Sequence, residues 1–234
     1  MQFSKALQNS FSLESYGVKI GVESNEKGIF DEMLERIPRA IPNGFSPINP
    51  EEIVHQIIVK ANKKSTEYKL FRNDEKIVES SIRESILDSF ESWLRLTVAE
   101  FARKHIFVHA GVISWKGKAI ILPGYSFHGK TTMVAELIKR GGIYFSDEYA
   151  ILDEDGLVYP YPKMLSLRGI IDEYRQVDYS AESLGAVVGT SPVPVGLVFI
   201  TEYKPNARWK PKQLSSGEGV MELLKHTVSV RQNP

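Results

Sequence analysis

A segment rich in glycine and ending in lysine and threonine offers the clearest chemistry in the sequence. It spans residues 124–131 and fits the spacing G-x-x-x-x-G-K-[ST] of phosphate-binding (Walker A) loops. Glycine at both ends lets the backbone curl, so that several N–H groups point at one anion. Lys130 can reach the β- and γ-phosphates of a nucleotide, and the Thr131 hydroxyl can coordinate Mg²⁺. The pattern predicts an ATP and Mg²⁺ site formed by Gly124, Tyr125, Ser126, Phe127, His128, Gly129, Lys130, Thr131 and Thr132.

Two adjacent carboxylates end the next apolar segment. Residues 143–145 predict a short buried strand, and Asp147 and Glu148 stand at its end. In a mixed or parallel sheet that end lies beside the phosphate loop, where a carboxylate can hold Mg²⁺ or accept a proton. Successive strand residues point to opposite faces, so both acids reach the phosphates only if the strand has ended. We predict Asp147 as a proton acceptor or metal ligand and Glu148 as a metal ligand, with a solvated turn as the alternative.

Other polar side chains are candidates on less evidence. Arg168 is predicted to be a catalytic residue, because a guanidinium near the nucleotide can neutralise the charge that develops on the transferred phosphoryl group. His128 lies inside the loop, where its side chain can touch nucleotide or acceptor. His105 and His109 are four residues apart, but the chain from residue 107 predicts a strand, in which this spacing does not converge on one zinc ion. His226 has no partner at metal-ligand spacing and is interpreted as an ordinary histidine.

Composition narrows the class of protein. The 234 residues include 29 Lys and Arg against 29 Asp and Glu, so no overall field attracts nucleic acid or an anionic membrane. The chain has no cysteine, which excludes disulfides and thiolate metal sites and fits a reducing compartment. No apolar run approaches the ~20 residues that cross a bilayer. We expect a cytoplasmic protein that binds neither nucleic acid nor membrane.

Strands and turns on both sides of the loop supply its framework. Residues 109–114 and 119–122 predict a hairpin whose second strand leads directly into the loop. Residues 130–140 predict a helix that glycines end, and its positive dipole end faces the bound anion. The further predicted elements are a hairpin of 149–152 and 157–159, a buried strand over 195–200 and a short helix over 219–226.

The first 105 residues predict a separate α+β region. Its predicted elements are a half-buried strand over 16–22, a helix over 31–37, a proline-rich loop over 38–50, strands over 53–59 and 68–72, and a turn at 73–76. Residues 82–103 predict a helix with one buried stripe, formed by Ile82, Ile86, Phe90, Trp93, Leu94, Thr97, Val98 and Phe101. We expect one region over 1–105 and a nucleotide-binding domain over 106–234.

The motifs around the loop resemble those of one enzyme family. His109-Ala110-Gly111, the loop 124–131, residues 136–141 and Ser146-Asp147-Glu148 recur in this order, at similar spacing, in the catalytic domain of HPr kinase/phosphorylase. The resemblance covers residues 107–172. It implies an α/β fold in which a mixed β-sheet carries the phosphate loop, as in the nucleotide domain of phosphoenolpyruvate carboxykinase. The first 105 residues look more like the lead segment of HPr-kinase-related proteins, whose acceptor need not be HPr and whose chains commonly continue beyond the position of Pro234.

The resemblance also implies roles for individual residues. It puts His109 near the phosphates, where it orients or buffers the reacting groups, and makes Asp147 the general base on an acceptor hydroxyl. Glu148 stands where the family has a second acid. Residues 165–172 resemble a family segment that begins Glu-x-Arg-Gly, with Ser166 in the glutamate position, and a serine cannot supply the charge of a metal-binding glutamate. The family tends to form homo-oligomers, so one is expected here.

Two hypotheses of function follow. The first is an ATP-dependent kinase that transfers the γ-phosphoryl group to a hydroxyl, expected to be a serine of a protein or peptide. Asp147 would deprotonate the acceptor while Lys130, Mg²⁺ and the loop N–H groups hold the charge. The second is a nucleotide-binding module without turnover that controls a partner protein. Ser166 in the glutamate position favours this alternative.

Overall fold

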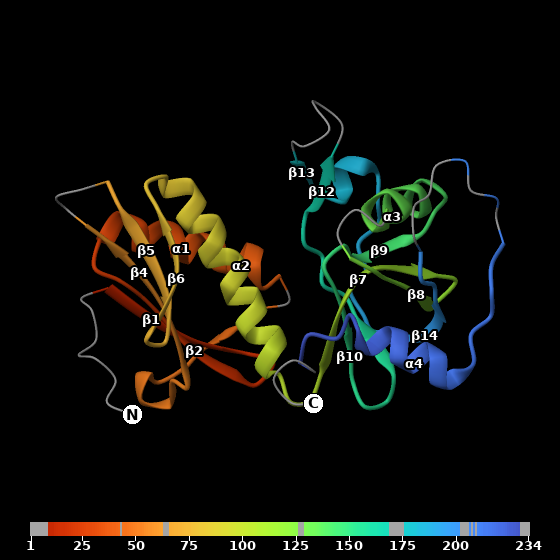
Figure 1. Ribbon diagram of the computed structural model, residues 1–234, viewed down its shortest axis with the longest axis horizontal. Helices are drawn as coiled ribbons and strands as arrows, with labels where there is room; N and C mark the ends of the chain where they lie inside the picture. The colour runs from red at the N-terminus through yellow and green to blue at the C-terminus, as the bar shows by residue number, and fades with distance from the viewer. Residues whose placement is uncertain are drawn as a thin grey trace. The chain divides into compact units, whose positions relative to one another are not determined.

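A computed structural model describes residues 9–42, 44–62, 66–125, 129–168, 176–201, 206, 208 and 210–229 of the protein. The chain divides into two compact units, Met1–Arg103 and Lys104–Pro234, each of which can be followed in Figure 1. Within the described residues each unit combines a six-stranded mixed sheet with two α-helices. The predicted α/β class with mixed sheets is therefore confirmed. No helix in the described ranges is long and apolar enough to cross a membrane.

The first unit is a six-stranded sheet with two helices. Its sheet has the order β3-β1-β2-β4-β5-β6, in which only β2 and β4 run parallel. The elements are β1 (Asn9–Ser15), β2 (Val18–Ser24), α1 (Lys27–Ala40), β3 (Ser46–Pro47), the 3₁₀ turn Pro50–Glu52, β4 (His55–Ala61), β5 (Tyr68–Arg72), β6 (Glu75–Ser80) and α2 (Arg83–Phe101). Fully buried side chains of the sheet, such as Ile57 and Leu70, join the core that the helices cover.

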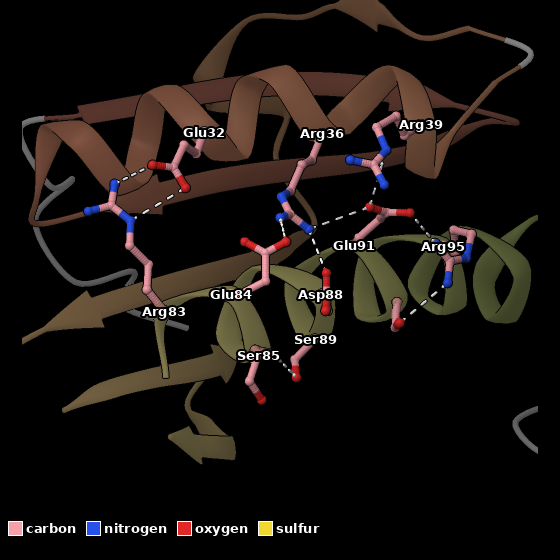
Figure 2. Close-up of polar contacts among 11 residues, drawn as sticks. Glu32, Arg36, Arg39, Arg83, Glu84, Ser85, Asp88, Ser89, Glu91 and Arg95 are labelled. Carbon is pink, nitrogen blue, oxygen red and sulfur yellow. Dashed lines mark hydrogen bonds and ion pairs between the residues drawn. The ribbon is translucent and has the colours of Figure 1, made fainter. Parts of the chain in front are cut away.

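Ion pairs tie α1 to α2 (Figure 2). The largely buried Arg36 of α1 contacts Glu84, and it lies 2.7 Å from Asp88 of α2. Arg83, the first residue of α2, pairs with Glu32 of α1 at 2.5 Å. The predicted stripe of α2 is confirmed at its centre, where Phe90 and Leu94 are fully buried, and is wrong at Ile82, which is 64% exposed because it precedes the helix.

Two sequence predictions for this unit are wrong in detail. Tyr16 and Gly17 do not begin a strand but form the turn between β1 and β2, with φ of 50° and 79°. Helix α1 is twice the predicted length and contains Pro38 in its last turn. Proline there leaves one carbonyl without its helical donor, but Ile37 and Ala40 are buried, and this packing holds the turn. Tertiary burial therefore overrides the local breaker.

The second unit carries the predicted phosphate loop, residues 124–131. Its elements are β7 (Ile106–Trp115), β8 (Lys118–Pro123), α3 (Lys130–Lys139), β9 (Ile143–Ser146), β10 (Tyr149–Leu152), β11 (Leu157–Tyr159), β12 (Leu165–Arg168), β13 (Gln176–Tyr179), the 3₁₀ turn Glu182–Leu184, β14 (Val193–Val198) and α4 (Ser216–Leu224). Strands β12 and β13 form a separate two-stranded sheet. Both predicted hairpins and the helix after the loop are confirmed.

The pairings of this sheet close into a ring. Strand β7 pairs with β8 and with β10, β10 pairs with β11, and β14 joins β11 to β8. Small and β-branched side chains, among them Ala110, Ala119 and Val158, form one core cluster of the unit. A second cluster lies beneath α3, where Val134 and Ile138 pack with Ile113 and Leu122. The loop therefore leaves β8 at a point where both sides of the sheet are filled.

Strand β14 differs from its prediction. The apolar run 195–200 predicts a buried strand, but Val195, Leu197 and Val198 are 37%, 49% and 37% exposed. The strand pairs with β8 through Val195, Leu197 and Val198 and with β11 through Val193 and Pro194. The prediction of a strand is confirmed and that of burial is wrong, because strand pairing satisfies backbone groups and leaves these side chains open to solvent above and below the sheet.

Candidate functional site

The end of the phosphate-loop segment has the backbone that its motif requires. Gly129 precedes α3 with φ of 82°, a left-handed conformation that residues with a Cβ adopt only with strain. The first amides of α3 therefore open toward the loop. Ser126, Phe127 and His128 lie outside the described residues, so the predicted loop contacts of these three are not described. Thr132 is exposed on the first turn of α3.

Lys130 bridges the two ends of the loop. Its ammonium donates to the carbonyl oxygens of Gly124 at 2.8 Å and Tyr125 at 2.9 Å. The residue is only 7% exposed. Burial lowers the pKa of this ammonium from its ordinary value, and the negative charges of Asp147 and Glu148 oppose that shift. The charge is therefore held in a desolvated position, where an added anion would interact with it strongly.

Asp147 and Thr131 meet directly. The Thr131 hydroxyl donates to Asp147 Oδ2 at 2.9 Å. The other carboxylate oxygen, Oδ1, is buried and has no hydrogen-bond partner within the described part of the chain. Burial raises the pKa of Asp147 to about 7, and the hydrogen bond from Thr131 opposes this rise. A carboxyl group with this pKa exchanges its proton near neutral pH, as a general base must.

Asp147 reaches Thr131 because it lies in the short gap between strands β9 and β10. Strands β9 and β10 both pair antiparallel with β7, and the ladder is interrupted between them at Asp147 and Glu148. Such an interruption re-aims side chains. Strand β7 separates β9 from β8, so the carboxylate reaches the loop past Gly111 of β7. A Cβ at Gly111 would lie 2.5 Å from Val134 Cγ2 and 3.8 Å from Asp147 Oδ1, so glycine here gives α3 its close approach.

Glu148 points to a different partner. Its Oε2 accepts from Lys163 Nζ at 3.1 Å, and the two side chains are 23% and 19% exposed. Its backbone carbonyl accepts from the Ala110 N–H at 3.1 Å, which continues the pairing with β7. Asp147 and Glu148 therefore have separate side-chain partners, Thr131 and Lys163.

His109 lies on β7 near these charges. Burial lowers the pKa of its imidazole, the nearby Lys130 lowers it further, and Glu148 opposes the shift. The ring is therefore mainly neutral at pH 7 and able to accept a proton. Its backbone N–H donates to the carbonyl oxygen of His226 at 2.8 Å.

The segment after α4 completes this side of the site. His226 is 8% exposed, and its ring lies 4.7 Å from that of Tyr125 in an edge-to-face arrangement. Thr227 forms a β-bridge with Val108, which holds the segment against β7. Sequence reasoning set His226 aside and did not consider Lys163. Nothing in their sequence neighbourhoods indicates proximity to residues 109–131, since tertiary pairing alone brings them there.

The remaining candidates lie on β12. Ser166 and Arg168 belong to this strand, opposite Asp178 and Gln176 of β13. Their side chains are outside the described residues. Leu165, the first residue of β12, is fully buried in the cluster beneath α3. The strand is thus anchored to the unit that carries the loop.

The side chains that converge here could bind an anion together with a metal ion. Two ammonium groups, Lys130 and Lys163, stand with two carboxylates and a neutral imidazole, and the carboxylate of Asp147 keeps one oxygen without a partner among the described residues. A hard cation such as Mg²⁺ prefers oxygen ligands of this kind, and commonly takes one or two carboxylates together with substrate phosphates. Neither a protein-family model nor a curated protein matches the chain.

Proposed function

We propose that the protein is an ATP-dependent kinase that transfers the γ-phosphoryl group of ATP to a hydroxyl. The observation that carries this proposal is the contact between Thr131 of the loop helix and the buried Asp147, whose pKa is raised to about 7. A phosphate-binding motif alone supports binding. A proton acceptor with a pKa near neutrality beside that motif supports transfer.

The site fits a magnesium ion. Thr131 Oγ1 and Asp147 would hold it, because Oδ1 of Asp147 is buried without a hydrogen-bond partner in the described ranges. Bound there, Mg²⁺ would offset the charge of the nucleotide's phosphates.

The protein's own groups would act as follows. Lys130 would leave the carbonyls of Gly124 and Tyr125 for the more strongly attracting phosphate oxygens. Asp147 would take the proton of the acceptor hydroxyl while the oxygen of that hydroxyl forms a bond to the γ-phosphorus. The bond from that phosphorus to the oxygen of the β-phosphate breaks, and ADP leaves with the electron pair. His109, neutral near pH 7, would orient the reacting groups.

The acceptor is proposed to be a serine of a protein or peptide. This step rests on the resemblance of residues 107–172 to HPr kinase/phosphorylase. A nucleotide-binding module without turnover is the second candidate, and Ser166 in place of a glutamate favours it.

Asp147→Asn distinguishes the two candidates. Asparagine keeps the size of the side chain but cannot accept the proton. Binding of Mg-ATP is measured by calorimetry, and single-turnover transfer is measured with [γ-³²P]ATP and a library of serine peptides. The kinase predicts that transfer falls about 10²-fold or more, while Mg-ATP affinity falls far less, because the amide oxygen of asparagine can still ligate the metal. A parallel fall in affinity would assign Asp147 chiefly to the metal. Wild-type protein that binds Mg-ATP but never releases ADP would support the module instead.

A further inference from the structure

The backbone fixes Lys163 to the strand that ends beside Asp147. The Tyr144 hydroxyl of β9 donates to the Lys163 carbonyl oxygen at 2.5 Å. Lys163 N donates to the carbonyl oxygen of Tyr161, whose own N–H donates to the carbonyl oxygen of Phe145 in the same strand. Tyr144 is fully buried, and burial raises its pKa well above the usual value, so it remains a donor. Lys163 is therefore held near Asp147 by contacts that do not involve its charge.

The ammonium of Lys163 acts on the groups that the proposed transfer uses. It lies 3.1 Å from Glu148 Oε2. Its positive charge also opposes the rise in the pKa of Asp147 that burial causes, and it adds to the lowering of the pKa of His109 by burial. The charge is thus near the proposed base and the neighbouring imidazole, although residue 163 belongs to neither the loop nor its helix.

The ion pair with Glu148 leaves donors of Lys163 unused. An ammonium has three N–H donors, and Glu148 is the acceptor that the described residues supply. The side chain is 19% exposed, so the ammonium is partly withdrawn from solvent. A partly buried pair of this kind contributes little net stability, because desolvation offsets the attraction. An anion with several acceptor oxygens would satisfy what remains.

We propose that Lys163 binds the terminal phosphoryl group of a nucleoside triphosphate, a role that rests on the kinase proposed above. Lys130 reaches the loop, and so serves the β-phosphate as well as the terminal one. Lys163 stands with Glu148 and Asp147, where the transferred group must meet its acceptor. Lys130 thus contacts a group that ADP and ATP share, whereas Lys163 contacts only the terminal phosphoryl group. Lys163 therefore makes the site prefer a triphosphate over a diphosphate.

Lys163→Met tests this assignment through binding alone. Calorimetry measures the affinities of the magnesium complexes of ADP and of the non-hydrolysable β,γ-imido analogue of ATP. The variant is expected to weaken the analogue about tenfold or more, the scale of one charge-assisted hydrogen bond, and to leave ADP within about twofold. Lys163→Arg retains the cation and should retain most of the preference. Lys139→Met, which removes an exposed lysine of α3 paired with Glu136, is the matched control and should change neither affinity.

Glu148→Gln distinguishes two explanations of a Lys163 effect: direct binding of the phosphoryl group by Lys163, and an indirect effect in which Lys163 only orients Glu148. It removes the negative partner and keeps the ammonium, so the ratio of the two affinities should persist. A Glu148→Gln variant that loses the ratio as Lys163→Met does would overturn the assignment, as would a Lys163→Met variant that keeps it. Wild-type protein that binds neither nucleotide would overturn the kinase proposal, and the role of Lys163 with it.

A measurement on the wild-type protein covers the case in which Lys163→Met does not fold. Acylation of lysines by an amine reagent, mapped by mass spectrometry, reports the accessibility of each ammonium. The ATP analogue should protect Lys163 more than ADP does, while both should protect Lys130. Equal protection of Lys163 by the two nucleotides would contradict the proposal.

Discussion

Replacement of Asp147 by asparagine should change how stability depends on pH. Burial raises the pKa of this carboxyl group from its ordinary value of 3.8 to about 7 in the folded protein. The folded state then holds the proton more tightly than the unfolded state, so wild-type stability falls as pH rises between these two values. Asparagine does not titrate and escapes this loss.

The size of the effect follows from the shift. Each pKa unit corresponds to about 1.4 kcal/mol, so the wild type should lose about 3 kcal/mol relative to Asp147→Asn between about pH 5 and about pH 8. Below the unfolded-state pKa the two proteins should differ little, because the protonated carboxyl and the amide are similar in size. The variant should therefore be the more stable protein at pH 8.

Hydrogen exchange of amides in β7, β8 and β9 measures the free energy of unfolding of the second unit by itself. Asp155→Asn, in the exposed turn between β10 and β11, is the matched control; it retains Asp147, so its stability should fall with pH as that of the wild type does. A difference between wild type and Asp147→Asn that stays the same at both pH values would refute the reasoning, since the carboxylate would then carry no burial cost. Added Mg-ATP should reduce the difference if the metal stabilises the ionised form.

Three further outcomes are expected. Lys130→Ala should weaken Mg-ATP binding by ~1–3 kcal/mol in calorimetry, because the buried ammonium no longer meets the phosphates; equal affinity would remove the phosphate-loop assignment. Thr131→Ala should weaken nucleotide binding in Mg²⁺ and much less in EDTA, and an unchanged metal dependence would show that its hydroxyl does not face the ion. Gly111→Ala should destabilise the second unit by ~1–3 kcal/mol in urea unfolding, because the added methyl group would lie 2.5 Å from Val134 of α3. An unchanged free energy of unfolding would mean that α3 can move away from β7 without loss of stability.

Local patterns were enough to predict the elements around the loop. The predicted helix of residues 130–140 and the hairpins on either side agree with the structure. The signals used were glycines at turns, apolar residues at the helical period of 3.6 and apolar residues that alternate along strands, and each of these depends only on residues close in sequence. Asp147 was likewise found from its place after an apolar strand. The predicted burial of β14 failed, since an apolar run reports preference for burial and not the presence of a covering element.

Tertiary structure decided the chemistry of the site. The sequence determined that a lysine, a threonine and a carboxylate follow a β-strand in an order suited to phosphate. It did not contain the pKa of Asp147, which depends on burial beside Thr131. Nor did it indicate Lys163 or His226, which reach the site through the hydrogen bond of Tyr144 and the pairing of residues 226–228 with β7. Backbone preference is set by adjacent residues, whereas desolvation and charge depend on which distant segments pack together.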